Sequence, residues 1–130
     1  MSPPTEEGQR LLRLARRDEA AFQALLAAPS VAVSVALFHA QQAAEKSLKA
    51  VMCLRGLEYR RTNDLEELAA QLANAGHAPT TDAADLQRLT PYAVEYRYDD
   101  DAPELLTGPQ ATAIVESLLA WGQAQFSLNP

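Results

Sequence analysis

Polar side chains that could bind a charged ligand recur at helical spacing between Phe38 and Leu54. An α-helix turns about 100° per residue, so residues three, four and seven positions apart share one side. The side chains that fall together in this way are His39, Gln42, Lys46, Lys49 and Cys53. We call these five residues the polar arc. Its two ammonium groups, its imidazole and its amide are suited to binding a phosphate group.

The same side chains have a structural interpretation, which the sequence leaves open. Glu45, Lys46, Lys49 and Arg97 can pair with one another inside the protein and fix the register of the helices. A single histidine such as His39 is also more often held by a structural hydrogen bond than used as a ligand contact. The function of the polar arc therefore depends on whether its cations face solvent or carboxylates of the same chain.

The opposite side of this stretch is apolar and predicts a buried helix. The stretch holds neither proline nor glycine, and the residues of its apolar side are Leu37, Ala44, Leu48, Val51 and Met52. Gln41 projects into this apolar side, where an amide without partners costs about 1–3 kcal/mol, so we expect it to be hydrogen-bonded. We predict that this helix, from about Ser30 to Arg55, is the most buried helix of the protein.

Length and composition indicate one domain over residues 1–130 that can bury a core of its own. Hydrophobic residues make up 48 % of the chain and charged residues 22 %, as is typical of a globular protein. The net charge is −6 and the pI about 4.8. Such acidity argues against a protein that coats nucleic acid, because phosphate binding needs a positive surface. Any phosphate site must be a local basic patch.

The single cysteine, Cys53, excludes an intrachain disulfide and favours a reducing compartment, so we expect a cytoplasmic protein. The N-terminal segment is polar and acidic, unlike a signal peptide, and no apolar run approaches the ~18 residues of a membrane span. We expect no metal and no cofactor. Neither His39 nor His77 completes the Glu-x-x-His pattern of a di-metal bundle. The acidic run at residues 99–101 is interpreted as a solvated loop.

Helical periodicity without an alternating strand pattern predicts an all-α protein, an up-and-down antiparallel helical bundle. We expect four long helices and one that is shorter or broken. The first helix should end near Ala28, with Asp18 in its otherwise apolar inner stripe. Its middle is basic because it contains Arg10, Arg13, Arg16 and Arg17. This pattern fits either a solvated helix face or a basic edge for a partner or nucleic acid.

Glycine and proline mark the expected helix ends. Gly56 and Gly76 should stop the second and third helices. Pro91 should kink or split the fourth helix, and the last helix should open at Gly108. Side-chain caps are expected at three helix starts, namely Ser30, Thr62 or Asn63, and Thr81.

The segment FHAQQAAEKSLKA at residues 38–50 resembles the second helix of prokaryotic HEPN domains, whose pattern is roughly H-x-Q-Q-A-x-E-K-x-L-K-A. Two further segments resemble later helices of the family in the expected order, TNDLEELAAQL at residues 62–72 and LTPYAVEYRYDDD at residues 89–101. The resemblance is strongest over residues 31–126. Two positions depart from the family pattern, since Asn63 replaces a histidine and Asp99 replaces a proline.

HEPN domains that act as ribonucleases carry an arginine, four to six further residues and then a histidine. Neither His39 nor His77 fits, because residues 32–34 read Ala-Val-Ser and residues 70–72 read Ala-Gln-Leu. Downstream of Arg97, residues 102–104 read Ala-Pro-Glu. RNA cleavage without a metal needs a base for the 2′-hydroxyl and a cation for the developing charge. Arg97 offers the cation, but the base is missing from its usual place, so we expect no catalytic residues.

The resemblance therefore implies a non-catalytic binding protein. Stand-alone HEPN proteins of this kind are commonly paired with a minimal nucleotidyltransferase, often in toxin–antitoxin-like pairs, and form homodimers. In the family's architecture the segment with Arg97 and Tyr98 packs near the helix of the polar arc. The ligand-binding residues expected for a nucleotide or RNA are therefore His39, Gln42, Lys46, Lys49, Arg97 and Tyr98. Two alternatives are a divergent ribonuclease toxin that uses Arg97 with a replacement base, and a helical adaptor without a ligand.

Overall fold

The computed structural model describes residues 3–59, 61–94 and 104–128, and every element in this part of the chain is a helix. Three helices are long, namely α1 (Pro3–Ala27), α2 (Val33–Leu54) and α5 (Gly108–Leu128). Two are shorter, α3 (Leu65–Asn74) and α4 (Ala83–Leu89), and the 3-10 helix η1 (Thr90–Ala93) continues α4. The predicted all-α bundle is confirmed, although α3, with 10 residues, is shorter than the three long helices.

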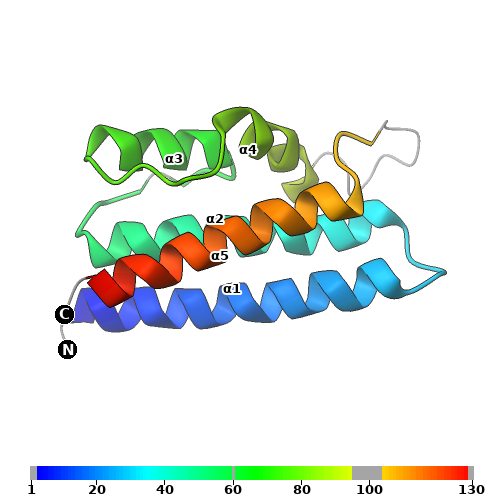
Figure 1. Cartoon of the computed structure of the whole chain (residues 1–130), viewed down its shortest axis with the longest axis horizontal. Helices are drawn as coiled ribbons and strands as arrows, with labels where there is room; N and C mark the ends of the chain where they lie inside the picture. The colour runs from blue at the N-terminus through cyan, green and yellow to red at the C-terminus, as the bar shows by residue number, and fades with distance from the viewer. Residues whose placement is uncertain (1–2, 60, 95–103, 129–130) are drawn as a thin grey trace.

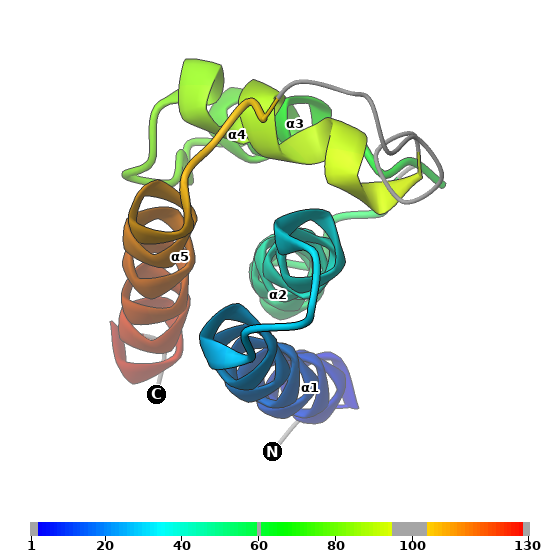
Figure 2. The same ribbon diagram turned by 90° about the vertical axis from the view of Figure 1, so that its right-hand side faces the viewer.

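Helix α2 occupies the centre of the bundle (Figures 1 and 2). It runs antiparallel to α1 along most of its length, and α5 lies beside both helices. The pair α3 and α4 forms a layer across α2 on the side away from α1 (Figure 2). Because three sides of α2 are covered by other helices, its remaining side is where partly exposed polar residues can lie.

The sequence of α2 explains this central position. Its buried residues include small alanines, such as Ala40 and Ala44, which let neighbouring helices approach closely, and larger side chains that fill the layers between helices. Leu48 is fully buried, with 0 % of its surface exposed. The prediction that α2 is the most buried helix is confirmed, because more of its residues are buried than in any other described helix.

The predicted chain breaks are confirmed, whereas the predicted caps are wrong by one to two residues. Gly56 and Gly76 both have positive φ, 70° and 84°, directly after the ends of α2 and α3. Pro91 lies in η1, where the chain changes from α to 3-10 geometry. The N-cap positions are instead Ala32, Asp64 and Asp82, and none of them forms a side-chain cap hydrogen bond.

The local hydrogen bonds explain why the caps moved. Ser30 lies in the turn that follows α1, where the backbone N–H of Val31 donates to the carbonyl of Ala28. Thr62 accepts a hydrogen bond from the backbone N–H of Asp64 through its hydroxyl oxygen, so it orders the loop before α3 rather than capping the helix.

Two aromatic side chains of the later helices lie in the core. Tyr92 and Trp121 are buried, with 1 % and 7 % of their surface exposed. The hydroxyl of Tyr92 accepts a hydrogen bond from the backbone N–H of Leu105 at 2.9 Å. The sequence predictions for Arg97 and Tyr98 and for the acidic run at residues 99–101 lie outside the described residues.

Candidate functional site

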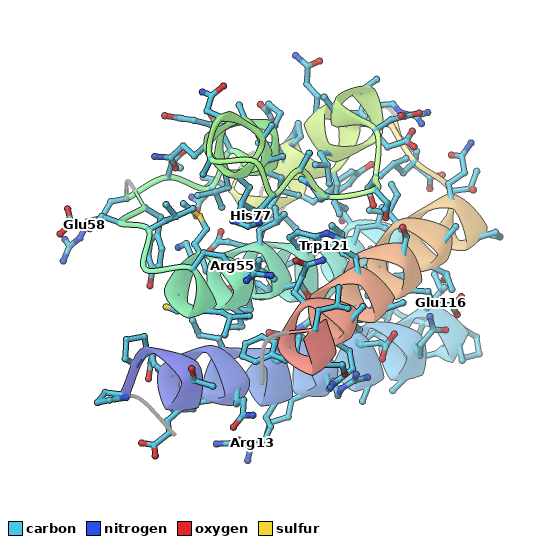
Figure 3. The ribbon with its side chains drawn as sticks, turned by 60° about the vertical axis from the view of Figure 1, so that its left-hand side comes forward. Arg13, Arg55, Glu58, His77, Glu116 and Trp121 are labelled. Atoms are coloured by element: carbon cyan, nitrogen blue, oxygen red, sulfur yellow. The ribbon has the colours of Figure 1, made fainter. Side chains whose placement is uncertain are left out.

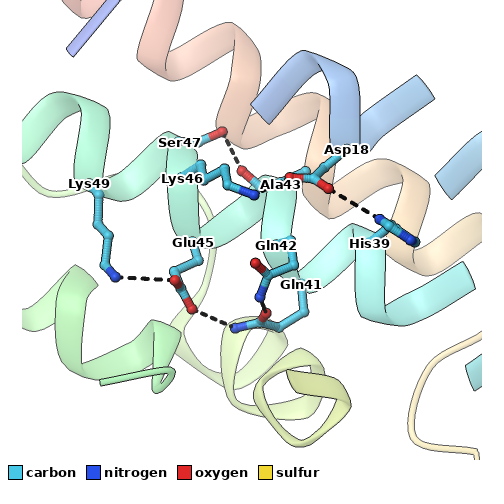
Figure 4. A network of polar contacts seen from close by, with 9 residues as sticks. All are labelled: Asp18, His39, Gln41, Gln42, Ala43, Glu45, Lys46, Ser47 and Lys49. Atoms are coloured by element: carbon cyan, nitrogen blue, oxygen red, sulfur yellow. Dashed lines mark hydrogen bonds and ion pairs between the residues drawn. The ribbon is translucent and has the colours of Figure 1, made fainter. Parts of the chain in front are cut away.

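Two residues of the polar arc, His39 and Lys46, are paired with a carboxylate from α1. The two carboxylate oxygens of Asp18 contact different partners, one His39 and the other Lys46 (Figure 4). Nδ1 of His39 lies 3.1 Å from Oδ1, and Nζ of Lys46 lies 2.5 Å from Oδ2. Only 15 % of the Asp18 side chain is exposed, so the carboxylate has little access to water. The contact joins α1 to α2, and the positive charge of Lys46 is balanced by a carboxylate of the same chain.

The sequence already carried a signal for this contact. Asp18 falls in the inner stripe of α1 together with apolar residues such as Leu11 and Phe22, which are buried in the core. A carboxylate in a stripe of this kind must find a cationic or hydrogen-bonding partner, because an unpaired buried charge is costly. The sequence could not name the partner, since His39 and Lys46 are 21 and 28 residues away along the chain.

Two further residues of the polar arc, Gln42 and Lys49, belong to a second network beside α3. Nζ of Lys49 donates to Oε2 of Glu45 at 3.1 Å, one turn earlier in α2. The same ammonium group lies 4.9 Å from the centre of the Tyr59 ring. The exposed fractions are 17 % for the Lys49 side chain and 12 % for that of Glu45, so this pair is largely shielded from solvent.

Gln41 is the buried amide of this second network, and the predicted hydrogen bonds are present. Its Nε2 donates to Oε1 of Glu45 at 3.2 Å and to the backbone carbonyl of Asn63 at 3.1 Å. Its oxygen accepts a hydrogen bond from Nε2 of Gln42 at 2.8 Å. Three of the amide's four hydrogen-bonding positions are thus used, and the carbonyl of Asn63 ties the loop before α3 to α2.

The expected ligand-binding residues therefore divide between two places. His39 and Lys46 converge on Asp18 at the α1 side, whereas Gln42 and Lys49 belong to the Gln41–Glu45 network (Figure 4). The structure does not bring Lys46 and Lys49 to one carboxylate. The remaining two expected residues, Arg97 and Tyr98, lie outside the described residues.

A shallow depression of about 280 Å³ lies beside Lys49 and is lined by this side chain and by the loop before α3. Its other lining residues are Arg61, Thr62 and Asn63. Arg61 is exposed. One exposed guanidinium and one largely shielded ammonium group could together hold a small anion there, although the charge of Lys49 is partly neutralised by Glu45.

Cys53, the last member of the polar arc, lies where α2 ends near the start of α1. Burial raises the pKa of its thiol, and the negative charge of Glu7 raises that pKa further. A hydrogen bond from the Tyr59 hydroxyl and the positive charge of Arg10 act in the opposite direction. A thiol with a raised pKa is largely protonated at neutral pH and is a poor nucleophile, so the site has no reactive cysteine.

A larger depression, of about 330 Å³, lies between the start of α4 and α5, where no site was expected. Ser117 of α5 accepts a hydrogen bond from the Thr81 hydroxyl at 3.1 Å there, and Arg88 pairs with Asp85 on the same rim. The sequence offers no signal for this hollow, because Ser117 and Thr81 are 36 residues apart and neither belongs to a charged motif.

No group of three or more His, Cys, Asp or Glu side chains suited to a metal ion lies within residues 3–59, 61–94 or 104–128. In the same ranges, no helix combines the length and the apolar character that crossing a membrane requires.

A family model described as the HEPN domain matches residues 9–125 of the chain. The match extends the resemblance seen in the sequence back into α1, which contributes Asp18 to the polar network. No curated protein and no solved structure matches the chain.

Proposed function

The chain belongs to the HEPN domain family, and from this premise we propose that it is a non-catalytic binding protein that works with a minimal nucleotidyltransferase in a toxin–antitoxin-like pair. The observation that carries this proposal is the missing ribonuclease motif. Neither of the two histidines, His39 and His77, follows an arginine at a spacing of four to six residues. Without that pair, the chain lacks the usual base for the 2′-hydroxyl of RNA.

The use of His39 within the fold supports the same proposal. Nδ1 of His39 is held by Asp18, whose other oxygen holds Lys46. Residues that join two helices in this way stabilise the bundle. The charge of Lys46 is already paired with Asp18 and is not directed at a ligand. The polar arc thus supports a binding scaffold better than an open catalytic centre.

The partner is tested by co-expression. The protein and the nucleotidyltransferase encoded beside its gene are produced together, with an affinity tag on the HEPN protein alone. We expect the two chains to co-purify and to elute as one species in size-exclusion chromatography. Separate elution of both chains would exclude the proposed pairing, as would the absence of a nucleotidyltransferase gene from the neighbourhood.

We further propose that the protein is a homodimer, as HEPN proteins commonly are. Light scattering at micromolar concentration should then give twice the chain mass of 14.1 kDa. A mass equal to that of one chain would contradict this part of the proposal and leave the pairing with a nucleotidyltransferase untouched.

The proposal also predicts that the purified protein does not cleave RNA. Incubation of labelled RNA in the presence of a chelator should give the same product profile as buffer alone. Cleavage that co-purifies with the wild type and is absent from an Arg97→Ala variant would instead favour the divergent ribonuclease. A protein that binds neither a nucleotidyltransferase nor a nucleotide would match the helical adaptor.

A second candidate function, nucleotide binding, is favoured by the depression beside Lys49. Arg61 and Lys49 supply cations and Thr62 supplies a hydroxyl around a volume of about 280 Å³. If this depression holds a nucleotide phosphate, calorimetry should detect weak ATP binding that falls with salt and is reduced in an Arg61→Gln variant. Equal heats of ATP binding for the wild type and the Arg61→Gln variant would exclude nucleotide binding in this depression.

A further inference from the structure

Three cations of α1 differ from Lys46 and Lys49 of α2, because they have no carboxylate partner among the described residues. Arg13, Arg16 and Arg17 are exposed, and none of them forms an ion pair with any residue in the described ranges. We call these three residues the arginine face. Arg10, one turn earlier, is excluded because it pairs with Glu7 at 2.6 Å. Figure 3 shows Arg13 projecting from the outer side of α1, away from α2.

The arginine face borders a hollow with an apolar floor. The hollow has a volume of about 200 Å³ and lies between α1 and the C-terminal half of α5. We call it the α1–α5 notch, and its lining residues are Gln9, Leu12, Arg13, Arg16, Gln123 and Phe126. Leu12 is buried and Phe126 is partly buried, so these two form the floor. The guanidinium of Arg16 donates to Oε1 of Gln123 at 3.3 Å across the rim.

Water alone can satisfy guanidinium groups on a flat helix surface. The notch makes this face different, because an apolar floor inside a ring of cations and amides offers a place for an apolar side chain whose neighbours are negatively charged. The remaining acidic residues of α1 do not fill this role internally. Glu6 and Glu19 form no ion pair with the arginine face among the described residues.

A second copy of the chain is a poor occupant. An interface with twofold symmetry places the same patch of both copies together, so two arginine faces would meet with like charges. The repulsion leaves this face outside a symmetric dimer interface and available to another partner.

A nucleic-acid strand fits less well than a protein segment. The chain carries a net charge of −6, which opposes the approach of a polyphosphate. Stacking of a base needs a free aromatic platform, and Phe126 does not stand free. A Cβ atom placed at Gly8 would lie 2.7 Å from Cζ of Phe126, so the ring is packed against the backbone of α1.

We infer that the arginine face and the α1–α5 notch form a docking site for an acidic segment of a partner protein, with an apolar side chain in the notch and carboxylates on Arg13, Arg16 and Arg17. This inference deepens the proposed function, because it names the surface and the chemistry that hold a protein partner. It depends on contacts of α1 and α5 only and makes no use of the polar arc.

The first test uses a synthetic peptide in which glutamates surround one leucine, labelled for fluorescence anisotropy at about 50 mM salt. We expect Arg13→Glu/Arg16→Glu to weaken peptide binding about tenfold or more, since each exposed pair is lost and replaced by repulsion. Arg88→Glu/Gln87→Glu/Asn74→Asp is the matched control, because it changes the net charge by the same amount at three exposed positions outside the notch and outside the depression beside Lys49. The control should bind as the wild type does.

Peptide variants separate the two parts of the site. Replacing the leucine by serine should weaken binding through loss of the anchor, and replacing the glutamates by glutamine should weaken it through loss of charge. Equal binding by the wild type and the Arg13→Glu/Arg16→Glu variant would overturn the inference. So would stronger binding of a labelled oligouridylate than of the peptide, with the same dependence on Arg13 and Arg16, because it would identify a nucleic-acid site.

The second test uses the co-expressed nucleotidyltransferase. We expect Arg13→Glu/Arg16→Glu to abolish co-purification, while Arg88→Glu/Gln87→Glu/Asn74→Asp retains it. A complex that survives in both variants would overturn the docking site and leave the proposed pairing intact. A wild-type protein that forms no complex would remove the proposed pairing, and the peptide experiment would then decide the docking site alone.

Discussion

The polar arc of α2 and the arginine face of α1 are both rows of polar residues at helical spacing, but they are used differently. Lys46 and Lys49 of the polar arc are 25 % and 17 % exposed, and both touch carboxylates of the same chain. The arginine face is exposed and has no such partners in the described ranges. Charge pattern alone therefore does not identify a binding surface, since the deciding fact is where the counter-charges lie.

The different uses follow from the position of each helix. Helix α2 is enclosed by α1, α5 and the α3–α4 layer (Figure 2). Its cations therefore lose part of their hydration and need partners within the protein. Helix α1 lies at the edge of the bundle, and its outer side meets solvent (Figure 1). The segment that most resembles the family, residues 38–50, thus contains the residues of the polar arc that form hydrogen bonds and ion pairs inside the protein.

The largest expected effect tests whether α2 is the centre on which this comparison depends. Leu48→Asp places a carboxylate at a position with 0 % exposure, so we expect the protein to lose more than about 4 kcal/mol and to unfold. Circular dichroism checks this, with Leu48→Met as the volume-matched control. A soluble, fully helical Leu48→Asp protein would place α2 at the surface.

A smaller loss is expected when the carboxylate that joins α1 to α2 is removed. Asp18→Ala leaves His39 and Lys46 without their shared partner, and we expect a decrease of about 2 kcal/mol in the free energy of unfolding, less than for a fully buried pair because both are partly exposed. Urea unfolding at neutral pH measures the decrease. Glu19→Ala, the neighbouring carboxylate without an ion pair in the described structure, should change little, and equal losses in both variants would contradict the role of Asp18.

The smallest effect concerns Cys53, the last residue of the polar arc, which lies near Glu7 of α1. Burial and Glu7 raise the pKa of Cys53 in the folded state, so the folded protein holds this proton more tightly than the unfolded chain does. The corresponding stability is fully present below the ordinary pKa of a thiol, and it is lost as the pH rises through the raised value. Between about pH 8 and 10 we expect the wild type to lose slightly more stability than Cys53→Ala. Parallel pH profiles of the two proteins would contradict this assignment.

The sequence was sufficient for the fold because the determining features are local. Periodicity in residues 38–54 gave α2 and its buried side, and Gly56, Gly76 and Pro91 marked the breaks correctly. Helix starts were predicted less well, because Ser30 and Thr62 form local turn contacts that compete with capping.

The candidate site was only partly predictable because its key contacts cross between helices. Spacing placed Lys46 and Lys49 on one side of α2, but the partner of Lys46 is Asp18, 28 residues earlier in the chain. The ion pair of Lys49 with Glu45 was within reach of sequence reasoning, because only four residues separate the two side chains. The α1–α5 notch joins residues more than 100 positions apart, as the contact of Arg16 with Gln123 illustrates, and it left no pattern in the sequence.

The most direct test of the account compares one charge reversal in each region, Lys49→Glu and Arg13→Glu, by urea unfolding at neutral pH. Lys49→Glu places two carboxylates together beside Gln41, and we expect it to lower the free energy of unfolding by about 3 kcal/mol. Arg13→Glu alters an exposed side chain without an ion pair in the described structure, and the free energy should stay within about 0.5 kcal/mol of the wild type. An unchanged stability of Lys49→Glu, or a loss of several kcal/mol in Arg13→Glu, would contradict the division between an internal polar arc and an open arginine face.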